Sequence, residues 1–340
     1  MSQISVNDIS SLDGKSGPVL SGITTVSSTG YMMIPAGPTE YRGGRGRGVF
    51  AGGHNPTVVN TIEYITISTL GDSLDFGDLN LGSNNSASWS SSTRGFISGG
   101  STPSVTASIR YVTISSTGNS FDFGELTSSV SNADGGGCAD FTRGIHMGGI
   151  GASNSKVTNY VTMSSIGNAS EFGDLIEGTQ LNGGTSNSTR GISCGGNPSL
   201  NLNNIQFCTI QTTGSFQDFG DLISRNRNNS ASSDGTRGVI FGGIDVPSSP
   251  VVFLNTIQYI TIASLGDAID FGDLSDNVLN GGSVENKTRG VYYHGSNPSG
   301  FINTIEYITI QTLGNAQDFG DMKTPRGVVA SCSDAHGGLG

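Results

Sequence analysis

Charged residues and long apolar runs are both scarce in this sequence. Charged side chains make up 13% of the 340 residues, about half of the ~25% that is usual in soluble domains. No stretch approaches the roughly 18 apolar residues that span a bilayer, and residues 1–20 have neither a basic start nor the apolar core of a secretion signal. We therefore expect a soluble protein with no membrane insertion and no secretion signal.

Cysteine is scarce as well. The four cysteines, Cys138, Cys194, Cys208 and Cys332, follow no zinc-site or redox spacing and are too few for a disulfide framework. We interpret them as small core residues. One alternative stays open, in which Cys194 and Cys208 face each other across a hairpin.

Glycine and acidic residues are in excess. The 53 Gly and 10 Pro amount to about a fifth of the chain, below the roughly 25–30% of low-complexity sequences, and no Gly-X-Y period appears. Disorder and a collagen helix are therefore excluded as the main state. The chain has 27 acidic and 16 basic residues and a formal net charge of -11, so nucleic-acid binding is disfavoured.

An internal repeat of about 48 residues organises most of the chain. Six Arg-Gly pairs begin at Arg47, Arg94, Arg143, Arg190, Arg237 and Arg289. Six Phe-Gly-acid blocks end in a second acid at Asp78, Glu125, Asp174, Asp221, Asp273 and Asp321. Each repeat contains four short segments rich in β-branched and aromatic residues and separated by turn residues, which predicts four strands.

Six four-stranded units predict an all-β fold, a six-bladed β-propeller over residues 41–340. The C-terminal residues 326–338 align with the first segment of a repeat, whereas the first repeat has only a weak first segment of its own. We therefore predict that residues 326–338 complete blade 1 and close the ring. Residues 1–40 lie outside the repeats and are predicted to form an extended arm that anchors the protein.

Two resemblances follow from these motifs. The diglycine after the second segment, as at Gly52-Gly53, and the aromatic residues of the third and fourth segments resemble kelch repeats, although Phe replaces their usual Trp. The near-identical sequence motifs of the repeats, together with the N-terminal residues 5–23, resemble those of virion structural proteins of tailed phages that infect marine cyanobacteria. The first resemblance implies a propeller, and the second implies a location in the virion.

The repeated charges suggest a structural role. We hypothesise that each Arg of the six Arg-Gly pairs bridges the second acid of a block, because a bidentate Arg–carboxylate pair fixes strand register. Since twelve acids lie in the six blocks, we also predict an acidic band around the propeller, partly paired with the arginines.

Other motifs point to no catalytic, metal or cofactor site. The repeated Asp-Phe-Gly lacks the other kinase signatures, and the paired acids lack a calcium-loop pattern. The histidines, His54, His146, His294 and His336, occupy different repeat positions, so they predict no ligand ring. The Arg-Gly segment at residues 41–49 has no basic or aromatic companion, so we expect no nucleic-acid binding.

These features predict a non-enzymatic virion structural protein, a decoration or fibre-like module that binds other virion proteins through residues 1–40. One alternative is a tail-fibre tip protein that binds a host receptor or glycan through the irregular loops at residues 54–59, 197–203 and 245–254. Its sugar-stacking candidates are Trp89 and Tyr292-Tyr293, which we expect to be packing residues. A propeller enzyme and a homo-oligomer are further alternatives.

Overall fold

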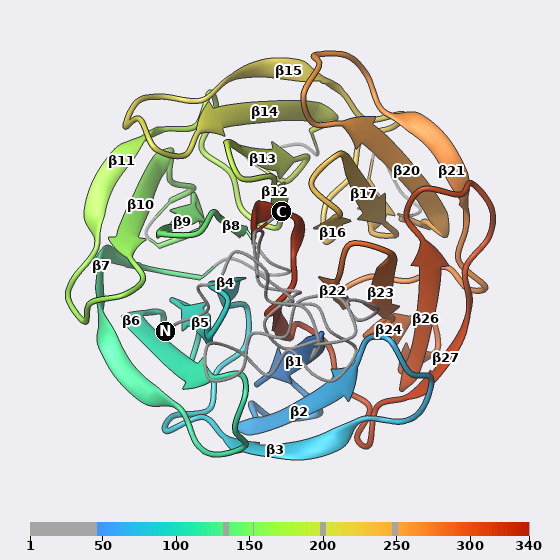
Figure 1. Ribbon diagram of the computed structural model, residues 1–340, viewed down its shortest axis with the longest axis horizontal. Coiled ribbons are helices and arrows are strands. Elements are labelled where there is room, and N and C mark those ends of the chain that lie inside the picture. Colours follow the sequence, from blue (N-terminus) through green and yellow to red (C-terminus); the bar gives the residue numbers. More distant parts are fainter. Residues whose placement is uncertain (1–45, 132–135, 152, 198–201, 247–250, 340) are drawn as a thin grey trace, which may run out of the picture.

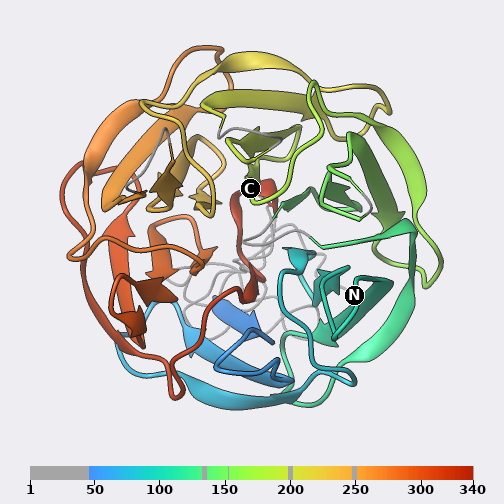
Figure 2. The same ribbon diagram turned by 180° about the vertical axis from the view of Figure 1, so that it is seen from behind.

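The computed structural model describes residues 46–131, 136–151, 153–197, 202–246 and 251–339. The chain forms six four-stranded antiparallel sheets around a central axis, which confirms the predicted all-β, six-bladed propeller (Figure 1). The same ring is seen from behind in Figure 2. The predicted arm lies outside the described residues, as do residues 41–45.

The first three blades are built from neighbouring parts of the chain, with one exception in blade 1. Blade 1 contains, from the axis outward, β28 (Ala330–Ser333), β1 (Arg47–Ala51), β2 (Thr61–Thr66) and β3 (Leu74–Asp78). Blade 2 contains β4 (Ala87–Ser90), β5 (Arg94–Ser98), β6 (Thr106–Thr113) and β7 (Phe121–Val130). Blade 3 contains β8 (Gly137–Ala139), β9 (Arg143–Met147), β10 (Val157–Thr162) and β11 (Ser170–Asp174).

The other three blades repeat this order. Blade 4 contains β12 (Gly183–Ser186), β13 (Arg190–Cys194), β14 (Asn204–Thr209) and β15 (Gln217–Asp221). Blade 5 contains β16 (Ser230–Ser233), β17 (Arg237–Phe241), β20 (Thr256–Thr261) and β21 (Ile269–Asp273). Blade 6 contains β22 (Gly282–Glu285), β23 (Arg289–Tyr293), β26 (Thr304–Thr309) and β27 (Gln317–Asp321).

Short additional elements decorate the ring. Two-stranded ribbons form from β18 (Ile244–Asp245) with β19 (Val252–Phe253) and from β24 (Ser296–Asn297) with β25 (Gly300–Phe301). A single 3₁₀ turn, η2 (Gly337–Leu339), follows β28. Within the described ranges, no helix has the length and apolar character needed to cross a membrane.

The C-terminal strand closes the ring. β28 pairs with β1 in antiparallel register, with Cys332 opposite Val49 and Ala330 opposite Ala51. This confirms the predicted completion of blade 1 by residues 326–338. The N-terminal and C-terminal parts of the described chain are thus hydrogen-bonded in one sheet, so no blade is left with an open inner edge at the seam.

The hydrophobic core lies between adjacent blades. In one cluster Val49, Ile62 and Phe76 of blade 1 pack against Ile97 and Val112 of blade 2, and all five side chains are buried. Burial of each such side chain contributes roughly 1.5–3 kcal/mol. Because neither blade can bury these faces alone, the stability of each blade depends on its neighbours.

Candidate functional site

The arginine of each Arg-Gly pair stacks on an aromatic ring of its own blade. The guanidinium carbon lies 4.5–4.7 Å from the ring centroid in all six blades. The stacked pairs are Arg47–Tyr64, Arg94–Tyr111, Arg143–Tyr160, Arg190–Phe207, Arg237–Tyr259 and Arg289–Tyr307. A cation–π contact of this kind contributes about 0.5–2 kcal/mol, depending on burial.

The same arginines join neighbouring blades. Nη1 of Arg47 donates to the carbonyl of Ile114 in blade 2, and the circle ends with Arg289 of blade 6, which donates to Ile67 of blade 1. The six hydrogen bonds measure 2.8–3.1 Å. Each arginine thus links its own third strand to the third strand of the next blade.

The predicted bridges between these arginines and the second acids are wrong. In blade 1, Arg47 is opposite Thr66 at one end of β2, whereas Asp78 is opposite Thr61 at the other end. Since each residue of a strand advances the chain by about 3.3 Å, the two side chains cannot meet within a blade. Among the described residues, none of the ion pairs joins the two series.

The Phe-Gly-acid block instead holds each outer strand against the next blade through its backbone. At the boundary of blades 2 and 3, the carbonyl of Phe123 accepts from the N–H of Gly167 at 3.0 Å, and the N–H of Glu125 donates to Oδ1 of Asn168 at 3.1 Å. A Cβ on Gly124 would lie 2.2 Å from the carbonyl oxygen of Gly167, so only glycine fits. The pattern recurs at all six boundaries and covers the edge of every outer strand.

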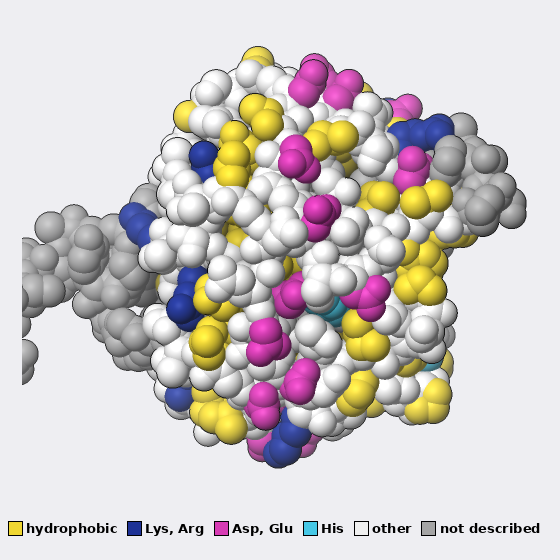
Figure 3. All heavy atoms as spheres, turned by 90° about the vertical axis from the view of Figure 1, so that its right-hand side faces the viewer, with side chains coloured by type: hydrophobic (Ala, Val, Ile, Leu, Met, Phe, Trp, Pro, Cys, Tyr) yellow, Lys and Arg dark blue, Asp and Glu magenta, His cyan; other side chains and the backbone are white. Residues whose placement is uncertain are grey.

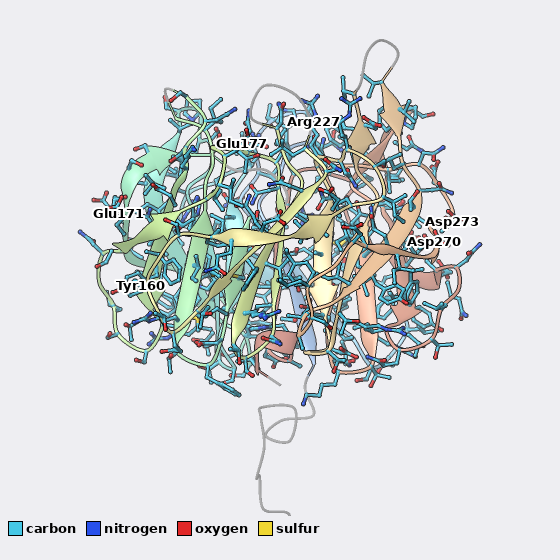
Figure 4. All side chains as sticks on the ribbon, turned by 90° about the horizontal axis from the view of Figure 1, so that it is seen from above. Tyr160, Glu171, Glu177, Arg227, Asp270 and Asp273 are labelled. Carbon is cyan, nitrogen blue, oxygen red and sulfur yellow. The ribbon has the colours of Figure 1, made fainter. Side chains whose placement is uncertain are left out.

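The carboxylates of these blocks form a circumferential acidic belt. The belt consists of the second acids and the first acids Asp75, Asp122, Glu171, Asp218, Asp270 and Asp318. All except the half-buried Asp273 are exposed. Figure 3 shows acids along the middle of one side of the ring, and Figure 4 shows Glu171, Asp270 and Asp273 at mid-height. The predicted band is therefore confirmed, without its pairing to the arginines.

A third set of interblade residues escaped the sequence analysis. These are buried polar side chains near the middle of each third strand, namely Glu63, Arg110, Asn159, Gln206, Gln258 and Glu306. Each bonds the backbone two or three residues after the Phe-Gly-acid block of the preceding blade, as when Gln206 accepts from Ile176 at 2.9 Å. Their signal in the sequence is a polar residue directly before the aromatic residue of every third segment. Because such buried groups must be hydrogen-bonded, they also fix the blade spacing.

A buried ion pair secures the seam between blades 6 and 1. The guanidinium of Arg326 bonds the carboxylate of Glu63, and both side chains are only 1% exposed. Nε of Arg326 also donates to the carbonyl of Gly52 at 2.8 Å, and its backbone N–H donates to the hydroxyl of Tyr293 at 2.7 Å. The closing segment is thus bonded to both blades that meet at the seam.

Inner strands are joined around the central channel by hydroxyl-to-carbonyl hydrogen bonds. Ser90 donates to Ser333, and Ser333 donates to Glu285, at 2.6 and 2.9 Å. Ser233 donates to Ser186, and Ser186 donates to Ala139 at 2.7 Å. The channel is therefore lined with serine, and about 50 Å³ within it is large enough for a few water molecules.

Glu285 is the unusual residue of the channel. It occupies the position that holds Ser90, Ser186, Ser233 and Ser333 in other blades, opposite the glycine of the Arg-Gly pair. Burial raises its pKa to about 8, opposed by hydrogen bonds from the backbone of Ser233 and the hydroxyl of Ser232. Its carboxyl group is therefore protonated at neutral pH.

The C-terminal tail caps one end of this channel. Nε2 of His336 faces the carbonyl of Ser90 at 2.6 Å, and the N–H of Gly338 donates to Nδ1 of His336 at 3.1 Å. These contacts specify the neutral Nε2–H tautomer, and burial lowers the pKa of His336 to about 4. η2 contacts β8, β12 and β16, so the tail crosses from blade 1 to the opposite side of the ring (Figure 1).

The two faces of the ring differ. The arginine face carries the six stacked arginines and the loops between third and fourth strands, such as residues 67–73. The loop face carries the diglycines and the loops between second and third strands, including the three loops predicted to be irregular. Residues 198–201 and 247–250 of those loops lie outside the described ranges.

The remaining predicted residues are placed as follows. Trp89, Tyr292 and Tyr293 are buried, which confirms them as packing residues. Cys194 is opposite Ile205 and Cys208 is opposite Gly191, so the hairpin pairing considered for these cysteines is wrong.

Cys208 has a different thiol partner. A hydrogen bond between the thiols of Cys138 and Cys208, together with burial, raises the pKa of Cys138 well above its usual value. No group of three or more potential metal-ligating side chains occurs within the described ranges.

No family model matches the chain, and no curated protein matches it.

Proposed function

We propose that this protein is a non-enzymatic structural component of a phage virion, a rigid propeller displayed on the particle and attached through residues 1–40. The observation that carries the proposal is that the described chain begins on one face of the ring and the irregular loops lie on the other face. Gly46, where the described chain begins, accepts a hydrogen bond from Ile67 on the arginine face, while the irregular loops lie on the opposite face. One face thus receives the N-terminal segment and the other presents variable loops.

Three further features support this proposal. The repeated arginines and the backbone of the Phe-Gly-acid blocks hold blade against blade, which gives a stiff platform without requiring a ligand. The repeat wording resembles virion proteins of cyanobacterial phages. Binding surfaces are commonly built from irregular loops on rigid scaffolds, so any contact with a host receptor or glycan belongs on the loop face.

Imaging of labelled particles tests the proposal. A gold label attached to the C-terminus of the full chain should appear at one repeated location on purified virions, on head, neck or tail. A variant that lacks residues 1–40 should keep the melting temperature of the ring but bind particles at least tenfold more weakly. Equal binding by the truncated and full chains would rule out the arm as the anchor, and absence of the protein from virions would rule out the proposed function.

A further inference from the structure

The arginine face carries unpaired positive charge on an otherwise acidic protein. The six stacked arginines are half-buried, and each uses Nη1 for a backbone carbonyl. Among the described residues, no carboxylate forms an ion pair with any of them. Twelve acids lie in the acidic belt, and most Lys and Arg side chains visible in Figure 3 lie toward one edge of that belt. Three further acids lie on the arginine face, where Asp334, Asp140 and Asp234 accept hydrogen bonds from the backbone N–H groups of Arg47, Arg143 and Arg237 and, within the described ranges, leave the guanidinium groups without an ion pair.

The same face exposes apolar side chains at equivalent loop positions. Leu70, Ile166, Leu265 and Leu313 are 53–64% exposed, and each directly precedes the glycine of a loop between third and fourth strands. Beside Leu70 lies a hollow of about 210 Å³, lined in part by Tyr64, the ring on which Arg47 stacks. This face therefore carries an exposed apolar side chain in four of the six blades, in addition to the arginine of each blade.

We propose that the arginine face docks against an acidic protein surface of the particle, whose carboxylates pair with the guanidinium groups and whose apolar side chains cover the exposed leucines and isoleucine. This inference rests on the proposed function and adds the orientation of the propeller and the chemistry of its partner. Arginine is favoured at such contacts because it forms bidentate pairs with carboxylates while it remains stacked on an aromatic ring.

The place where the described chain begins and the charge of the arginine face favour an acidic protein surface over other partners. The 45 residues that precede Gly46 join the ring at this face, so an anchor formed by residues 1–40 brings the same face toward the particle. A second copy docked face to face would oppose arginine to arginine. Nucleic acid would accept the arginines but would leave the exposed apolar side chains of this face uncovered.

A pair of matched double variants tests the docking surface. Leu265→Asp with Leu313→Asp alters the arginine face, and Leu81→Asp with Ile223→Asp alters the loop face. All four side chains are 51–59% exposed, so both variants should keep the melting temperature of the wild-type chain. The probe is purified particles from a phage whose gene for this protein is deleted, mixed with full-length labelled protein.

The arginine-face variant should bind these particles at least tenfold more weakly, and the loop-face variant within twofold of wild type. Binding of the wild type should also weaken at least tenfold between about 50 and 300 mM salt, because exposed charge pairs are screened. Loss confined to the loop-face variant, salt-independent binding, or loss after nuclease treatment would each overturn the inference while leaving the proposed function standing. If the wild-type chain binds no particles, the proposed function itself fails.

Discussion

Removal of the channel carboxyl group should change how stability depends on pH. Glu285 holds its proton up to about pH 8 in the folded protein, whereas an ordinary glutamate releases it near 4.5. Between these values the folded state binds more protons than the unfolded state, so the free energy of unfolding falls as pH rises. Glu285→Gln mimics the protonated form and should abolish this fall.

The expected loss of stability follows from the difference between the pKa values of Glu285 in the folded and unfolded states. Each pH unit in which only the folded state keeps the proton changes stability by about 1.36 kcal/mol, so the wild type should lose roughly 2.5 kcal/mol more than Glu285→Gln between pH 6 and pH 8.5. In a ring of nearly 300 residues that corresponds to about 4 °C in melting temperature. His146 and His336, whose pKa values are lowered to about 4 by burial, act in the opposite direction, because their penalty grows only as pH falls below about 6.5.

Thermal unfolding monitored by circular dichroism at both pH values, for wild type and variant, gives the difference directly. Titration of other groups cancels in that difference. Glu177→Gln is the matched control, because it removes an exposed carboxylate of the same type and should leave the wild-type pH profile unchanged. If Glu285→Gln and wild type lose the same stability between pH 6 and pH 8.5, the channel does not hold a protonated carboxyl group.

Other substitutions test the interblade contacts by urea unfolding. Arg190→Lys should cost about 1–2 kcal/mol, because lysine cannot keep both the ring stacking and the hydrogen bond to the next blade; an unchanged midpoint would contradict this. Gly124→Ala should cost at least ~2 kcal/mol, whereas Gly167→Ala, whose Cβ meets open space, should change stability by less than about 1 kcal/mol; equal effects would refute the close approach. Arg326→Met should cost roughly 3–5 kcal/mol, because Glu63 is left buried without its partner; additivity with Glu63→Gln would argue against their coupling.

Much of the fold was predictable from the period of the sequence. Six equal repeats of four short segments leave few architectures that bury both faces of every sheet, and the C-terminal residues 326–338 matched the one segment that the first repeat lacked. The same logic correctly assigned Trp89 and Tyr292 to the core and predicted the acidic belt. These successes share a cause, since each depends on where a residue lies in its strand and not on which side chain it meets.

The wrong predictions concern which side chains contact each other in the folded structure. Arg47 and Asp78 recur with one period, but a shared period only shows that both have fixed places in the blade. Their places are at opposite ends of β2. Arg47 meets the ring of Tyr64 and the backbone carbonyl of Ile114, and the backbone carbonyl of Asp78 accepts from the N–H of Ser120 in the next blade. Backbone partners leave no complementary residue type in the sequence, so no pattern could have indicated them.

Residues that break the repeat are the ones that adapt the ring to a single chain. Five blades take their four main strands from one continuous part of the chain, whereas blade 1 is completed by β28, which pairs with β1 from the other end of the described chain. That seam carries the buried ion pair Glu63–Arg326, and near it lie Glu285 and the tail residue His336, which have no equivalents in the other blades. A protein built only from perfect repeats would lack these contacts, and its closing strand would be interchangeable with the inner strands of its other repeats. The nonrepeated residues Arg326 and Glu285 therefore favour pairing of β28, and not of another inner strand, with β1.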